Sequence, residues 1–146
     1  MIAILRPDAW DFPLFLHVLG AVLLFGGVAS LVVISVGGLR VPDHAAMLRG
    51  LAFRTTLLLV WPAYVLMRVG AQWILSRENL EDDSPGWVGV GFVVSDAGIL
   101  VLLALTVLGW LALRRTRLAP WFTGLAAIYL VALGVAWFAM SAKPGA

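Results

Sequence analysis

The sequence predicts an all-α protein, a four-helix antiparallel bundle that spans a membrane. Of its 146 residues, 62% are apolar and only 12% are charged, whereas soluble domains average about 45–50% apolar and about 25% charged residues. Four apolar runs each reach the roughly 20 residues needed to cross a hydrocarbon core about 30 Å thick. Because these runs nearly exhaust the chain, we expect one transmembrane domain over residues 1–146, surrounded by a lipid bilayer.

The four predicted spans are separated by short polar segments. They cover residues 12–36, 51–75, 88–113 and 121–141. The first is followed by Gly37-Gly38, a pair that predicts a helix end. It also holds Gly26 and Ser30 four residues apart, a spacing that lets two helices approach closely in lipid. The second contains Pro62, which removes one backbone hydrogen bond and predicts a kink that neighbouring helices tolerate.

The arginines predict the orientation in the membrane. The first and third loops, counted with the start of the second span, hold six basic residues: Arg40, Arg49, Arg54, Arg114, Arg115 and Arg117. The opposite side holds Arg6, Arg77 and Lys143. Since cytoplasmic loops carry the excess of Lys and Arg, we expect the first and third loops in the cytoplasm and both termini outside.

Three ionisable residues inside the predicted spans fall in the outer half of the membrane. At a rise of about 1.5 Å per residue, His17 lies about 8 Å, Arg68 about 10 Å and Asp96 about 12 Å below the outer surface. Two opposite charges in lipid are strongly driven to find each other, so we predict an Arg68–Asp96 pair. Tyr64 and Gln72 share one side of the second span with Arg68, and we predict a site made of all five residues.

The predicted pair has three interpretations. It fixes the register of two helices, or it belongs to a small-ligand, cofactor or proton site that opens outward. In the third interpretation Arg68 snorkels past Trp73 to the membrane surface instead of pairing.

Several classes of chemistry lack their residues. The chain has no cysteine, which excludes disulfides, thiol catalysis and cysteine metal sites. No phosphate loop, HExxH or Ser/His/Asp motif supports a kinase or hydrolase, so we assign no catalytic residue and leave enzyme activity open. The net charge of +2 is too small to indicate nucleic-acid binding. The acidic loop over residues 76–87 lacks the alternation of an EF-hand, so we predict no metal site.

Haem b is a cofactor whose ligands the sequence permits. His44 lies in a cytoplasmic loop and His17 near the outer face, so the two cannot ligate one iron. A pair of His17 with Met67 or Met140 matches in depth, and His–Met ligation of haem is a known type.

One segment resembles known families. FLHVLGAVLLFGGVASLVV, in which His17 is followed by Gly26-Gly27, resembles the first helix of small bacterial four-helix membrane families, namely the HemJ-type protoporphyrinogen oxidases and the CopD-like copper-resistance membrane domains. In the HemJ type this histidine is tied to haem binding. The resemblance therefore implies a haem-linked role for His17 and a location in the bacterial plasma membrane. The segments LVWPAYVLMRVGAQWILSRE and WVGVGFVVSDAG resemble uncharacterised integral membrane proteins of actinobacteria and similar groups.

Three functions follow from these observations. The first is an integral membrane protein whose outward-facing buried polar site, the Arg68–Asp96 pair near His17, binds a small ligand or docks a partner. The second is a haem-linked redox or porphyrin enzyme resembling the HemJ type. The third is a small oligomeric channel, or an accessory subunit of a larger membrane complex, that associates through the small residues of its first or last span.

Overall fold

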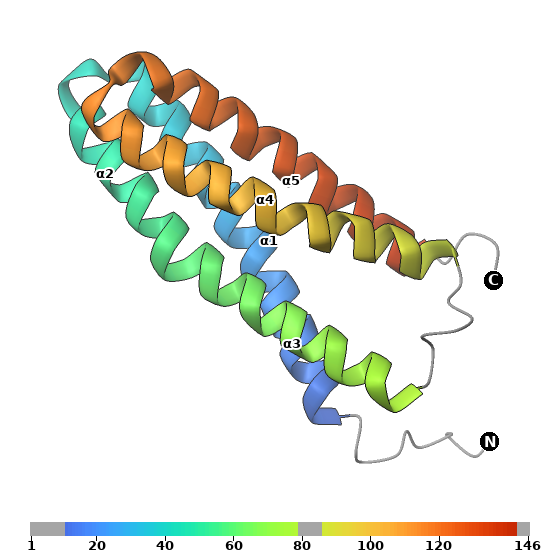
Figure 1. The fold of residues 1–146 in the computed structure, drawn as a ribbon. Helices are drawn as coiled ribbons and strands as arrows, with labels where there is room; N and C mark the ends of the chain where they lie inside the picture. The colour runs from blue at the N-terminus through green and yellow to red at the C-terminus, as the bar shows by residue number, and fades with distance from the viewer. Residues whose placement is uncertain (1–10, 79–85, 143–146) are drawn as a thin grey trace.

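The computed structural model describes residues 11–78 and 86–142, and this part of the chain is built from helices alone (Figure 1). Helix α1 (Asp11–Arg40) leads through a 3-10 turn (Pro42–His44) into α2 (Ala45–Thr55). A π-helical turn (Thr56–Val60) joins α2 directly to α3 (Trp61–Glu78). Helix α4 (Gly86–Arg114) is followed by a second 3-10 turn (Thr116–Leu118) and by α5 (Ala119–Ala142).

The described helices form four segments long and apolar enough to cross a membrane. They are Phe12–Arg40, Pro42–Ser76, Val93–Arg114 and Thr116–Ser141. The all-α prediction of four transmembrane helices is therefore confirmed. Large apolar side chains cover the outer faces: Val33, Leu58 and Phe138 are each more than 70% exposed. Such faces suit lipid rather than water, and the chain is a multi-pass membrane protein.

Helix α1 runs on through Gly37-Gly38 to Arg40, four residues past the predicted end. Gly38 lies at the contact with α2, where an added Cβ would be 3.4 Å from the Cβ of Leu48, an ordinary van der Waals distance. The glycine pair therefore lies inside a helix that packs on α2 and does not end it. The chain then turns at Pro42, where a continuing helix would be interrupted.

Pro62 is accommodated by the π-helical turn that precedes it. The backbone N–H of Trp61 bonds to the carbonyl of Thr56, five residues back, instead of four. This wider turn provides hydrogen-bond partners for backbone groups next to Pro62, which has no N–H to donate. The second span therefore continues through the proline as one long helical segment (Figure 1).

The helices form two pairs that diverge toward one end of the bundle. Helix α1 packs along α3, and α4 packs along α5. The pairs meet at the end that holds the two 3-10 turns, and they separate toward the end where α3 finishes and α4 begins (Figure 1). We call these the closed end and the splayed end. The closed part is filled by fully buried apolar side chains, including Leu24, Val28, Leu31, Val60, Leu102 and Leu105.

Two contacts show how α1 bridges the pairs. Phe12 packs edge-on against Trp73 of α3, with ring centroids 6.1 Å apart, at the splayed end. Phe25 packs edge-on against Trp137 of α5 at 5.3 Å, about halfway along α1. Helix α1 therefore packs on α3 toward the splayed end and on α2 toward the closed end, and it also contacts α5.

Candidate functional site

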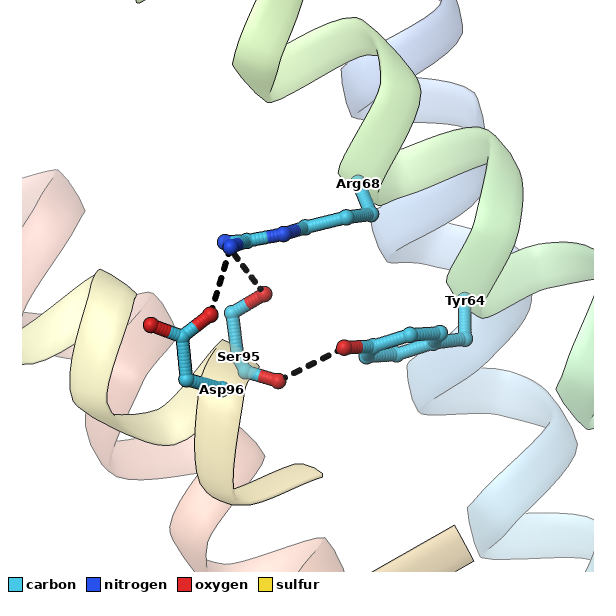
Figure 2. A network of polar contacts seen from close by, with 4 residues as sticks. All are labelled: Tyr64, Arg68, Ser95 and Asp96. Carbon is cyan, nitrogen blue, oxygen red and sulfur yellow. Dashed lines mark hydrogen bonds and ion pairs between the residues drawn. The ribbon is translucent and has the colours of Figure 1, made fainter. Parts of the chain in front are cut away.

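The structure brings Arg68 of α3 and Asp96 of α4 together across the gap between the two helix pairs. Arg68 Nη2 lies 2.5 Å from Asp96 Oδ1 (Figure 2). Arg68 Nη1 also donates a hydrogen bond of 3.2 Å to the hydroxyl of Ser95. One guanidinium thus contacts two consecutive residues of α4, and charge-assisted bonds of this kind are the stronger class of hydrogen bond.

Tyr64 adds a second link between α3 and α4. It lies four residues before Arg68, on the same side of the helix, and its hydroxyl donates a 2.8 Å hydrogen bond to the backbone carbonyl of Ser95 (Figure 2). The Tyr64 side chain is 5% exposed. Ser95 therefore receives hydrogen bonds at its side chain and at its backbone, and it anchors α4 against α3 at this level.

His17 contacts α3 but not the ion pair. Its Nδ1 lies 3.0 Å from the backbone carbonyl oxygen of Met67, the residue before Arg68. The two helix backbones are very close here: a Cβ on Gly70 would lie 2.8 Å from the Cα of His17, and one on Gly20 would lie 2.6 Å from the Cα of Met67. His17 is thus fixed at the α1–α3 contact, one residue from the predicted pair.

Gln72 does not join the polar network within the described residues, and its side chain is exposed. It lies one turn past Arg68, toward the end of α3 that separates from α4 (Figure 1). The divergence also exposes the ion pair: the side chains of Arg68 and Asp96 are 31% and 61% exposed. The expectation of a buried pair is therefore wrong for Asp96, which lies more outside the bundle than inside it.

A cavity of about 430 Å³ lies beside this network, between α1, α3, α4 and α5. We call it the lateral cavity. Its polar lining residues are His17, Arg68, Ser95, Tyr129 and Ser141. The remaining lining is aliphatic, aromatic or thioether, and it includes Phe25, Leu133, Trp137 and both Met67 and Met140. Val18, Val22 and Trp137 line it and are 49–50% exposed, so the cavity reaches the apolar outer surface of the bundle.

Two further residues of the site, Ser95 and Tyr129, were not predicted from the sequence. Tyr129 of α5 is 2% exposed, and its hydroxyl has no hydrogen-bond partner within the described part of the chain. It packs against Gly98, where a Cβ would lie 2.8 Å from the hydroxyl oxygen. The available signals were a serine next to the intramembrane aspartate and one of only two tyrosines inside an apolar span. Neither signal says which face of its helix is involved.

Among residues 11–78 and 86–142, no group of three His, Cys, Asp or Glu side chains is placed to hold a metal ion. Most of the acidic loop considered above, residues 79–85, lies outside the described residues. His17 and His44 lie on different parts of the bundle, His17 on the lateral cavity and His44 in the 3-10 turn of the closed end.

No protein-family model, no curated protein and no solved structure matches this chain at a significant level. The fold defines the class, a multi-pass membrane protein whose described residues form four helices long and apolar enough to cross a membrane.

Proposed function

We propose that the lateral cavity binds a small amphipathic ligand that reaches it from the membrane. The observation that carries this proposal is a cavity of about 430 Å³ with a mostly apolar lining and a few polar groups, among them His17, Arg68 and Ser95. Ligand sites typically measure about 300–1,000 Å³ and combine an apolar lining with a small number of placed polar groups. Half-exposed Val18, Val22 and Trp137 give the ligand a route from the lipid-facing surface.

In this proposal the Arg68–Asp96 pair supports the wall of the site. Arg68 lines the lateral cavity, while its guanidinium bonds to Ser95 and Asp96 on α4. These bonds, with the Tyr64–Ser95 bond, hold the two helix pairs at a set separation next to the cavity. Intramembrane ionisable residues are costly and are functional candidates for that reason.

The test is saturable quenching of Trp137 fluorescence by 10-bromodecan-1-ol, because bromine quenches indole only at contact and Trp137 lines the cavity. The fluorescence of Trp137 is obtained by subtracting the fluorescence of Trp137→Phe from that of the wild type in the same micelles. We expect saturation in the wild type and its loss in Ala71→Phe, which places a ring in the cavity. Ala104→Phe is the matched control, since Ala104 is exposed on α4 and does not line the cavity. Quenching of Trp137 that rises linearly and equally in the wild type, Ala71→Phe and Ala104→Phe would refute the proposal.

A haem-linked redox function is the second candidate, because the Nδ1 contact with Met67 leaves the Nε2 of His17 as the ring's other ligating atom. Met140 lines the same cavity, so a His–Met ligand set is compatible with the site. The absorption spectrum of the purified protein, recorded before any probe is added, separates the two candidates. A Soret band that disappears in His17→Ala would assign the cavity to haem, and a colourless protein would eliminate this candidate.

We also propose that the closed end faces the cytoplasm of a bacterium and that both termini lie outside. The support is the basic residues at the closed end, among them exposed Arg40, Arg114, Arg115 and Arg117. Because the chain has no cysteine, single-cysteine variants report cleanly on orientation. In intact cells a membrane-impermeant maleimide should label Ser76→Cys near the splayed end, whereas Thr116→Cys should react only after permeabilisation. The reverse labelling pattern would show the opposite orientation.

A further inference from the structure

The hydrogen bond of His17 fixes which of its ring nitrogens faces a ligand. The backbone carbonyl of Met67 only accepts hydrogen bonds, so the Nδ1 of His17, 3.0 Å away, carries the proton. In the neutral imidazole, Nε2 is then an acceptor with no proton of its own. Within residues 11–78 and 86–142, Nε2 makes no hydrogen bond. His17 lines the lateral cavity, and Nε2 is the hydrogen-bond acceptor that its neutral ring can offer a ligand there.

The position of this acceptor is set by backbone packing. The Cα of His17 would lie 2.8 Å from a Cβ on Gly70, so α1 rests on α3 with no side chain between them at this point. The ring is also held by the bond of its Nδ1 to the Met67 carbonyl of the same helix α3. A group fixed in this way loses little conformational freedom when it binds a ligand, which favours affinity.

The charged residues near the cavity do not favour an ionic ligand. The guanidinium of Arg68 already bonds to Asp96 and to Ser95, so its charge is matched by a carboxylate of this chain. A ligand anion would have to compete with Asp96 for it. The ligand that gains most from this cavity is uncharged, and it carries a hydrogen-bond donor for His17.

The apolar lining determines the length and polarity of the rest of the ligand. Lining residues run from Leu14 to Phe25 on α1, about 16 Å at a rise of 1.5 Å per residue. His17 is near one end of this length, and the Phe25–Trp137 ring pair is about 12 Å further along α1. The cavity thus fits an elongated, mostly apolar body with a polar group at His17.

From these observations we propose that the lateral cavity takes an uncharged, membrane-soluble alcohol or phenol, whose hydroxyl donates a hydrogen bond to the Nε2 of His17. Its apolar body lies along α1 toward Phe25 and Trp137. This inference rests on the proposed function, since it names the chemical class of the ligand for the same cavity.

A matched pair of probes tests the hydroxyl. 10-Bromodecan-1-ol donates a hydrogen bond, while 10-bromodecyl methyl ether has the same chain and only accepts. From quenching of Trp137 we expect the alcohol to bind the wild type about fivefold to tenfold more tightly than the ether, the ratio that one hydrogen bond of typical net strength gives. Both dissociation constants are measured in the same micelles, and the partition of each probe into the micelles is measured separately.

Variants of the two histidines locate the effect. In His17→Phe the preference for the alcohol should fall to about one, and in His17→Gln, whose amide oxygen still accepts, part of it should return. His44→Ala at the closed end should keep the full preference. Equal binding of alcohol and ether to the wild type overturns the inference and leaves the proposed function standing. Absence of saturable quenching by both probes overturns both.

Discussion

Replacing Gly20 by alanine is expected to force α1 away from α3 and to lower the free energy of unfolding by about 1–3 kcal/mol or more. The new Cβ would overlap the backbone nitrogen of Met67 and lie 2.6 Å from its Cα. Both obstacles are backbone atoms, so no rotamer change relieves them. Gly70→Ala should have an effect of the same order, because its Cβ would meet the backbone of His17 and the carbonyl of Pro13 at 2.8 Å.

The control for this prediction is a glycine of the same helix. A Cβ on Gly26 meets nothing within 4 Å, so Gly26→Ala should be neutral or slightly stabilising, as alanine is the better helix former. Unfolding in mixed micelles, titrated with a denaturing detergent, gives the comparison. Equal stability of Gly20→Ala and Gly26→Ala would mean that α1 and α3 are not in backbone contact in the folded protein.

Breaking the Arg68–Asp96 pair is the other change with a large expected effect. Arg68→Leu and Asp96→Leu should each destabilise, and the double variant should lose less than the sum of the two by about 1–2 kcal/mol. The sum of the two single losses exceeds the loss of the double variant because each single change leaves the other charge without its counter-ion. The 61% exposure of Asp96 keeps this coupling well below that of a fully buried pair.

The two single variants should also differ from each other. Removing Asp96 leaves the charge of Arg68, which is only 31% exposed, without its counter-ion, whereas removing Arg68 leaves the charge of Asp96, which is 61% exposed. Asp96→Leu is therefore expected to be the more destabilising change. Ser95→Ala, which removes one neutral acceptor of Arg68, should cost only about 1 kcal/mol. Strictly additive losses in the double variant would show that the two side chains do not interact in the membrane.

The sequence was sufficient for the spans and for the pairing of charges, because both follow from strong physical terms. Long apolar runs have no stable alternative to a membrane helix, and two opposite charges at similar depth are drawn together. Opposite charge and similar depth together identified Arg68 and Asp96 as partners. These two properties did not identify Ser95, because its hydrogen bonds to Tyr64 and Arg68 depend on the rotation of α4 about its axis.

The placement of Gln72 and the small residues of α1 required the structure. Helical periodicity places Gln72 on the side of Arg68, but the shared side leads to a shared contact only where α3 and α4 stay parallel, and they diverge. Gly26 and Ser30 have the spacing of a helix contact, yet both are exposed in this chain, and Ser30 bonds to the carbonyl of Gly26 in its own helix. Gly20 and Gly70 make the close approach instead.

The position of the bromine atom of 10-bromodecan-1-ol, found by anomalous diffraction from crystals of the complex, tests the central claim most directly. With the hydroxyl at His17, the bromine should lie inside the bundle beside Phe25 and Trp137, between α1 and α5. Bromine found only among lipid on the outer faces, with α1, α3 and α5 closed on each other around His17, would contradict the claim that this protein holds a ligand between its diverging helix pairs.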